Sequence, residues 1–251
     1  MELGLKGKRV LVTGGTRGIG AAIVRGFLAE GASVAFCARK EAEVLAQVDA
    51  WRSEGHSVIG SVCDVADAEA YKAWIESSVQ SLGGLDVFVP NVSGGASQGE
   101  EGWKRAFDVD LMATVRGCEA VLPHLAATNG NIVVIASIAA LEGTGGPAPY
   151  NTAKAALIAY SSQLGEVAGQ HNIRVNTVSP GPIHVEGGFW GDIQRNQPEM
   201  YQAVCARHGE MRLGTTDEVA NCVVFLASSA ASWVTRSNMI VDGGFCQRVQ
   251  Y

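Results

Sequence analysis

The sequence KRVLVTGGTRGIG, residues 8–20, contains a glycine-rich turn between two segments of different periodicity. Its first six residues predict a buried strand, and apolar residues recur at helical spacing from Gly18 until Gly31 ends the helix. Glycines at positions 14, 18 and 20 allow a tight turn, so the backbone can approach a pyrophosphate at the helix N-terminus. The stretch therefore predicts a strand, a turn and a helix that bind a dinucleotide.

The alternation of strands and helices continues along the chain. Further apolar runs predict strands at 32–37, 56–62, 85–89, 131–136, 173–178 and 239–241, with helices at 67–81, 103–125 and 150–169 and another from 215. Seven strands separated by helical crossovers indicate one α/β domain over residues 1–251, with a parallel sheet covered by helices on both faces. The stretch 182–213 is too long for an ordinary connection, so we expect a mobile, partly helical lid over the site.

Composition excludes several classes of partner. The net charge is −6 and the basic residues are dispersed, so neither nucleic acid nor an anionic membrane is an expected partner. No apolar run reaches the roughly 20 residues that span a bilayer, and the N-terminus lacks the pattern of a signal peptide, so we expect a cytoplasmic protein. The six cysteines and five histidines lack the spacing of metal ligands, so no bound metal is expected, and most cysteines are expected in the core.

The end of the second predicted strand bears on the choice of cofactor. An enzyme that uses NAD(H) tends to place an Asp or Glu there for the ribose 2′-hydroxyl, whereas this chain has Ala38 and Arg39, with Arg17 inside the glycine turn. Two guanidinium groups and no carboxylate favour a 2′-phosphate, hence NADP(H) over NAD(H). The alternative is that both arginines are solvated surface charges. Asp64, after the third strand, either binds the adenine amino group or caps a turn.

Tyr150 and Lys154 are four residues apart on a predicted helix, and Ser137 precedes them by thirteen residues. Positions i and i+4 share a helix face, so the Lys154 ammonium can lie beside the Tyr150 oxygen. A neighbouring cation favours the phenolate and so suits the tyrosine to proton transfer, while Ser137 can donate its hydroxyl to a substrate oxygen. Such pairs are also common on solvated helix faces, so this interpretation depends on the other motifs.

Taken together, the motifs resemble the short-chain dehydrogenase/reductase family over nearly the whole chain, and its 3-oxoacyl-ACP reductase-like members in particular. The matching stretches are TGGTRGIG (13–20), CDV (63–65), LDV (85–87), YNTAK (150–154), RVNTVSPG (174–181) and VDGG (241–244). The resemblance implies a single Rossmann-type, doubly wound domain and a nicotinamide cofactor. It also implies a homotetramer or homodimer that packs through its long helices and C-terminal segment.

The resemblance implies roles for individual residues as well. Tyr150 would exchange a proton with the carbonyl or alcohol oxygen, Lys154 would hold the nicotinamide ribose, and Ser137 would orient the substrate oxygen. The expected cofactor-binding residues are Gly14, Thr16, Arg17, Gly18, Ile19, Gly20, Arg39, Asp64, Val65, Asn91, Tyr150, Lys154, Pro180, Gly181 and Ile183.

Three positions depart from the family pattern. Only Asn91 matches in the segment after the fourth strand, Asp110 replaces an active-site asparagine, and Val185 replaces a threonine near the cofactor. Asp110, the fourth candidate catalytic residue, can accept a hydrogen bond from water or from Lys154, but it also competes for the charge of the lysine. We expect Asp110→Asn to retain at least part of the activity; complete loss in a folded variant would indicate that the carboxylate has a role of its own.

The sequence thus predicts an oxidoreductase that transfers a hydride between NADP(H) and a ketone or secondary alcohol. The expected pocket walls, at 93–97, 138–149 and 184–190, lack clustered cations, so a neutral or mostly apolar carbonyl compound is favoured, and carrier-bound 3-oxoacyl chains remain compatible. Glu142 and Glu186 either bind a polar substituent or face solvent, as loop carboxylates usually do. The alternatives are a catalytically weak nicotinamide-binding sensor or scaffold, and an isomerase or dehydratase, for which the C-terminal half is short.

Overall fold

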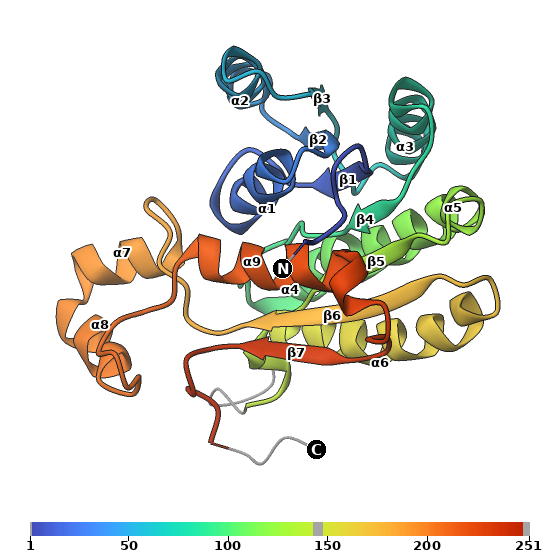
Figure 1. The fold of residues 1–251 in the computed structure, drawn as a ribbon. Helices are drawn as coiled ribbons and strands as arrows, with labels where there is room; N and C mark the ends of the chain where they lie inside the picture. The colour runs from blue at the N-terminus through green and yellow to red at the C-terminus, as the bar shows by residue number, and fades with distance from the viewer. Residues whose placement is uncertain (1, 143–147, 248–251) are drawn as a thin grey trace.

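The computed structural model describes residues 2–142 and 148–247, which form one seven-stranded parallel sheet between two layers of helices (Figure 1). The strand order is β3-β2-β1-β4-β5-β6-β7, which confirms the predicted Rossmann-type, doubly wound architecture. The strands are β1 (Arg9–Thr13), β2 (Ser33–Ala38), β3 (Val58–Val62), β4 (Val87–Val89), β5 (Asn131–Ile135), β6 (Arg174–Pro180) and β7 (Asn238–Val241).

Alternate side chains of each strand face opposite layers, as the period of two requires. In β1, Val10 and Val12 pack into the core beneath α1 (Gly18–Ala29), α2 (Glu41–Ser53) and α9 (Thr216–Ala227). Leu11, between them, packs into the core beneath α3 (Ala68–Leu82), α5 (Ala113–Ala126) and α6 (Pro149–Gly169). Both faces of the sheet are therefore buried, which explains why the strands are continuous apolar runs. Four of the cysteines, Cys37, Cys63, Cys118 and Cys205, are buried free thiols, in line with their predicted place in the core.

The helix predicted over 103–125 is longer and less regular than expected. It begins as α4 (Gly99–Arg105), continues as the π-helical turn η1 (Ala106–Met112) and ends as α5. A π-turn changes the direction in which the following side chains point, and such turns concentrate at functional sites. The apolar periodicity of the sequence does not reveal this irregularity, and the residues on either side of it have ordinary helical dihedral angles.

The stretch after β6 contains two short helices, α7 (Phe189–Asn196) and α8 (Pro198–Cys205), which pack against each other. In Figure 1 they lie beyond the carboxyl ends of β6 and β7. A single bridge between Ile183 and Gly214 closes the base of this segment. The partly helical character expected for 182–213 is present, while its action as a lid stays a prediction. No helix within the described ranges combines the length and apolarity needed to cross a membrane.

The end of this segment is fastened to α9 by a capping box. Thr215 Oγ1 accepts from Glu218 N at 3.3 Å, and the Glu218 carboxylate accepts from Thr215 N at 2.7 Å. Arg212 also donates to both Glu218 oxygens, at 2.7 and 3.0 Å. These bonds, chiefly the one from Arg212, lower the pKa of Glu218 from 4.5 to about 2.

Glu218→Gln is therefore expected to lower the free energy of unfolding at neutral pH by roughly 0.5–1 kcal/mol, a value reduced by the partial exposure of the pair. Because the folded-state pKa is depressed, this contribution is present above pH 4.5 and disappears as the pH falls through about 2. Thermal or urea unfolding of both proteins across this range measures it. Glu210→Gln, at a residue that shares Arg212 but does not cap α9, is the control.

Candidate active site

The glycine turn joins β1 to α1 in a conformation that suits glycine alone. Gly14 has φ +72° and Gly18 has φ +56°. A Cβ added at Gly20 would lie 2.0 Å from Gly14 O, a separation that no side chain tolerates. Arg17, at the N-cap of α1, makes no side-chain capping bond, so the first amides of the helix remain directed at the space in front of it. This arrangement can bind an anion such as a phosphate.

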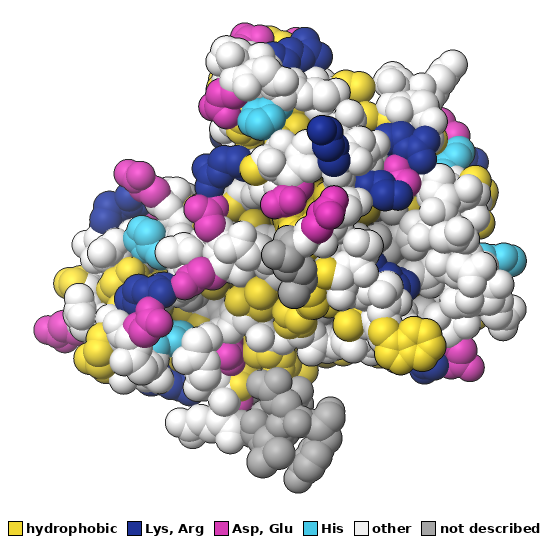
Figure 2. Space-filling view, viewed as in Figure 1, with side chains coloured by type: hydrophobic (Ala, Val, Ile, Leu, Met, Phe, Trp, Pro, Cys, Tyr) yellow, Lys and Arg dark blue, Asp and Glu magenta, His cyan; other side chains and the backbone are white. Residues whose placement is uncertain are grey.

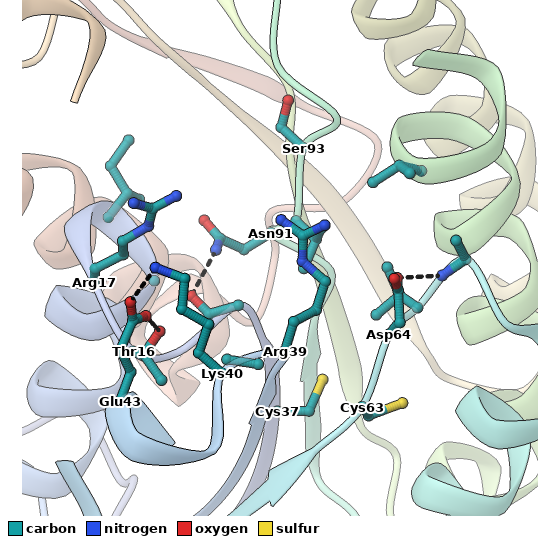
Figure 3. Close-up of a pocket in the computed structure, with 18 of the residues that line it drawn as sticks. Thr16, Arg17, Cys37, Arg39, Lys40, Glu43, Cys63, Asp64, Asn91 and Ser93 are labelled. Carbon is teal, nitrogen blue, oxygen red and sulfur yellow. Dashed lines mark hydrogen bonds and ion pairs between the residues drawn. The ribbon is translucent and has the colours of Figure 1, made fainter. Parts of the chain in front are cut away.

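A cleft of about 320 Å³ opens at the carboxyl ends of β1 to β4 (Figure 3). β1 pairs with β2 on one side and β4 on the other, so the cleft lies where the strand order reverses, as in other dinucleotide-binding sheets. The structure brings nine of the predicted cofactor-binding residues to its lining: Gly14, Thr16, Arg17, Ile19, Gly20, Arg39, Asp64, Val65 and Asn91.

Asn91 connects the ends of β1 and β4. Its Nδ2 donates to Thr13 O at 3.0 Å, and its backbone N donates to Thr13 Oγ1 at 2.9 Å. The neighbouring Val92 N also donates to Thr13 Oγ1, at 3.3 Å. Asn91 therefore holds the wall of the cleft in place beside the glycine turn.

Cations gather at one end of the cleft. The side chains of Arg17, Arg39 and Lys40 are exposed there, and Figure 3 shows the Lys40 ammonium turned toward Glu43. One carboxylate, Glu43, lies among them, and it accepts from Lys40 Nζ at 2.8 Å and from Thr16 Oγ1 at 3.2 Å. The bonds from Lys40 and Thr16 hold the pKa of Glu43 below its usual range. Both Glu43 oxygens are thus occupied by donors of the protein itself, which leaves the two arginines to an incoming anion.

Asp64 lies on the opposite side of the cleft from Arg17. Its Oδ1 accepts from Ala66 N at 3.0 Å, which closes a turn after β3. Of the two roles considered for Asp64, the turn cap is present, and recognition of adenine stays a prediction. The buried side chain of Val65 forms the apolar lining beside it.

Ser137, Tyr150 and Lys154 converge at the end of β5. Ser137 caps the short 3₁₀ helix η2 (Ile138–Ala140), which packs against α6, and its Oγ accepts from Ala139 N at 3.1 Å. Tyr150 lies in the first turn of α6, and Lys154 Nζ is 5.7 Å from the centre of its ring. Lys154 Nζ also donates to the carbonyl of Ile135, two residues before Ser137, at 3.1 Å. Tyr150 and Lys154 therefore lie together on α6 at the predicted spacing, and the lysine is 2% exposed rather than solvated.

Asp110 faces the same lysine from η1. Its carboxylate is fully buried, and Oδ1 lies 3.2 Å from Lys154 Nζ. Its other oxygen, Oδ2, accepts from Gly94 N at 2.8 Å. The competition for the lysine charge expected from the sequence therefore occurs as a direct buried ion pair.

The remaining predicted residues follow β6. Pro180 ends the strand, and Gly181 N donates to Val241 O at 2.9 Å. The backbone of Gly181 lies so close to Asp242 that a Cβ on Gly181 would be 2.6 Å from Asp242 Cβ. Ile183 is buried and lines a second hollow with His208 and Asp242 rather than the main cleft. Val185, by contrast, lines the main cleft and lies over Gly18. The departure at Val185 therefore places two methyl groups against the glycine turn.

Three charged residues that line the cleft are not predicted from the sequence: Lys40, Glu43 and Arg105. Lys40 and Glu43 carry a usable signal, because a Lys–Glu pair three residues apart at the start of a helix forms an ion pair. Arg105 carries no such signal in the sequence. Its Nε donates to Gly94 O at 2.7 Å, a tertiary contact that no local pattern predicts.

The expected substrate walls are only partly described, because 143–147 lie outside the described residues. Glu142 accepts from Gln247 N at 3.1 Å, so the C-terminal segment lies against the loop that follows Ser137. Glu186 is exposed, and the aromatic rings of Phe189 and Trp190 pack edge to face with centroids 5.2 Å apart. Neither carboxylate is thereby identified as a substrate ligand.

Comparison with known sequences identifies full-length relatives. A family model described as enoyl-(acyl carrier protein) reductase matches residues 14–246. Isoepoxydon dehydrogenase patN of Penicillium expansum is 39% identical over 259 residues, which cover 100% of this chain and 99% of the relative. Dehydrogenase/reductase SDR family member 4 of Homo sapiens is 34% identical, with 98% of this chain and 90% of the relative covered.

Solved structures agree with these matches. L-Sorbose reductase from Gluconobacter frateurii, in complex with NADPH and L-sorbose, superposes with a TM-score of 0.92 at 31% identity and covers 99% of this chain and 100% of its own. A 7α-hydroxysteroid dehydrogenase in complex with NADH and 7-oxo glycochenodeoxycholic acid superposes with a TM-score of 0.90 at 28% identity, with 99% and 98% covered.

Gly20→Ala is expected to abolish tight cofactor binding, because its Cβ would collide with the Gly14 carbonyl. Titration of NADPH fluorescence should show a dissociation constant raised at least about tenfold, since the phosphate cradle can no longer close. Gly169→Ala, at a position with nothing within 4 Å of the added Cβ, is the matched control. Wild-type affinity in Gly20→Ala would refute the role of this turn.

Proposed function

The chain belongs to the short-chain dehydrogenase/reductase family, and we propose that it transfers a hydride between NADP(H) and a ketone or secondary alcohol. Members of this family carry out such transfers with a nicotinamide cofactor. The proposed catalytic residues of this chain are Ser137, Tyr150 and Lys154. The observation that carries the proposal is the buried Lys154, held beside the Tyr150 ring at the end of the strand that leads to Ser137. Most lysines with a purely structural role remain at the surface.

The cleft fits a dinucleotide. Gly14 and Gly20 have no side chains that would keep a pyrophosphate away from the backbone, and no side chain caps the amides at the start of α1. A pyrophosphate requires both features in order to bind there. When bound, the cofactor supplies the hydride donor or acceptor, and the protein supplies position and proton transfer. Gly181 packs without a side chain against β7, so Pro180 and Gly181 can form the floor beside the nicotinamide.

Proton transfer is assigned to Tyr150. In ketone reduction its hydroxyl donates a proton to the substrate oxygen, and in alcohol oxidation its phenolate accepts one. Lys154 stabilises the phenolate electrostatically and is held in place by the Ile135 carbonyl and Asp110. Ser137 orients the substrate oxygen with its hydroxyl, whose oxygen is already fixed by the bond from Ala139 N.

The cations of the cleft support NADP(H) as the preferred cofactor. Arg17 and Arg39 are exposed at the expected 2′-phosphate end, and the nearby Glu43 is neutralised by Lys40. A guanidinium binds phosphate in a bidentate manner, which makes these arginines better phosphate ligands than a lone lysine. The structural neighbours bound to NADPH and to NADH indicate that both cofactors fit this fold.

A neutral ketone or secondary alcohol is the proposed substrate. One relative is named as an isoepoxydon dehydrogenase, and the two solved structures hold L-sorbose and 7-oxo glycochenodeoxycholic acid, compounds that differ widely in size. Their range favours a panel of cyclic ketones, ketoses, steroid ketones and 3-oxoacyl thioesters over a single candidate. Lysine and arginine do not cluster among the described residues of the three expected walls, which supports an uncharged reacting end.

We also propose a homotetramer or homodimer and a cytoplasmic location. Phe107 and Met112 of η1 and Val167 of α6 are large apolar side chains exposed on the long helices, which supports association through them. On the face shown in Figure 2, Lys and Arg are interspersed with Asp and Glu, which supports a small-molecule partner over nucleic acid. Light scattering and cell fractionation test the two proposals.

Tyr150→Phe removes the proton donor and is expected to lower kcat for ketone reduction at least about a thousandfold, at the upper part of the range for general acid catalysis. Cofactor affinity should change little. The assay follows NADPH oxidation with the substrate panel, and Tyr160→Phe, ten residues further along α6, is the matched control. If wild-type protein binds NADPH but reduces nothing, and Tyr150→Phe changes nothing, the sensor or scaffold alternative replaces this proposal.

Arg39→Ala tests the cofactor preference. We expect kcat/KM for NADPH to fall about tenfold or more, because a charge-assisted contact to the 2′-phosphate is lost, while kcat/KM for NADH stays unchanged. Steady-state kinetics with both cofactors measures the ratio. Arg25→Ala, at an exposed arginine on α1 paired with Asp217, controls for loss of positive charge. An equal loss with both cofactors would contradict the phosphate assignment.

A further inference from the structure

Asp110 makes two contacts that require a carboxylate. Oδ2 accepts from Gly94 N at 2.8 Å, and Oδ1 lies 3.2 Å from Lys154 Nζ. Among the described residues Oδ1 has no hydrogen bond of acceptable geometry, so its contact with Lys154 is an ion pair. The side chain is 0% exposed, so bulk water does not replace either contact.

Both partners of Asp110 are donors. A carboxylate accepts on each oxygen, whereas an asparagine amide has one acceptor oxygen and one donor NH₂ group. An asparagine at this position would therefore turn its NH₂ group toward either the Gly94 amide or the Lys154 ammonium. In a buried site such a donor–donor contact is repulsive, so only an acidic residue satisfies both sides.

Gly94 is also held from its other side. Arg105 Nε donates to Gly94 O at 2.7 Å, so α4 and η1 together hold both polar groups of this residue. A Cβ on Gly94 would lie 3.1 Å from Arg105 Cγ and equally close to Asp110 Oδ2, which shows how tightly the two side chains enclose it. We name Arg105, Gly94 and Asp110 the Gly94 clamp.

The Gly94 clamp spans the distance between cofactor and catalytic residues. Arg105 and Ser93, the neighbour of Gly94, line the cofactor cleft. At the other end, Asp110 contacts Lys154, whose ammonium lies 5.7 Å from the centre of the Tyr150 ring. A short chain of direct contacts thus leads from the wall of the cleft to the ammonium beside the proton donor.

We propose that the Gly94 clamp positions Lys154 for catalysis, and that the Asp110 charge offsets part of the effect of the lysine on Tyr150. This inference rests on the proposed function of Tyr150. Among the described residues, the ammonium faces Asp110 from η1, Tyr150 from α6 and the Ile135 carbonyl from β5. Asp110 compensates the positive charge of the Lys154 ammonium, which lies over the Tyr150 ring, so loss of the Asp110 charge leaves that positive charge uncompensated and favours the phenolate.

The experiment compares Asp110→Asn with Asp108→Asn, an exposed acid in the same π-turn. In Asp110→Asn, kcat for ketone reduction should fall about tenfold or more, with a smaller change in KM, because Lys154 loses its anionic partner or Gly94 N loses its acceptor. The rising limb of kcat/KM against pH for alcohol oxidation should move to lower pH by about half a unit or more. Asp108→Asn should match wild type in both. An unshifted limb in Asp110→Asn would overturn the proposal.

A second readout does not require turnover. Ultraviolet difference titration of wild type against Tyr150→Phe reports the phenol directly, and its midpoint should also lie lower in Asp110→Asn. Absence of turnover in wild type would refute the proposed function, while this titration would still decide the role of Asp110.

If Asp110→Asn does not fold, the Arg105→Lys variant tests the proposal instead. This substitution keeps the positive charge, and the side chain of Arg105 is exposed, so the variant is expected to fold. Loss of the planar donor to Gly94 O should lower kcat several-fold at an unchanged melting temperature. An unchanged kcat in Arg105→Lys would overturn the clamp.

Discussion

A charged group that is buried away from water must form hydrogen bonds or ion pairs within the protein. The arrangement of the whole site depends on how this is achieved for Lys154. Burying an unpaired ammonium costs several kcal/mol, yet Lys154 is 2% exposed. The sheet supplies one partner, the carbonyl of Ile135 at the end of β5, and the π-turn supplies the other, the Asp110 carboxylate. The end of a strand, an irregular helix turn and the first turns of α6 must therefore assemble together before the lysine can occupy its place.

The sequence predicted those parts of the molecule that local chemistry determines. The strands follow from apolar runs buried on both faces, the glycine turn from backbone geometry, and the Tyr150–Lys154 pair from helical spacing. Asp110 is visible in the sequence as a departure from the family pattern, but its hydrogen bond from Gly94 N and its ion pair with Lys154 depend on where the π-turn directs its side chain. Arg105 was missed because its contact with Gly94 joins separate segments. Local patterns carry no information about such approaches.

The cleft shows how a single acidic residue can coexist with a site for a phosphate. Glu43 lies among Arg17, Arg39 and Lys40, where an unpaired carboxylate would repel an anion. Lys40 and Thr16 each occupy one of its oxygens, so its charge is balanced within the protein. In the proposed assignment, cofactor choice depends on this network of charges rather than on one residue after β2, and substitution of Arg39 alone leaves the Lys40–Glu43 pair intact.

The hydrogen bond from Gln247 N to Glu142 bears on where a label can be attached to the protein. Gln247, the last described residue, lies beside the loop that follows Ser137, whereas the Leu3 carbonyl accepts hydrogen bonds from Ser229, two residues after α9. A label attached at Gln247 would therefore lie beside the loop that follows Ser137, whereas a label attached at Leu3 would lie beside Ser229 and leave that loop undisturbed, so the position near Leu3 is the better choice for a probe on the active protein.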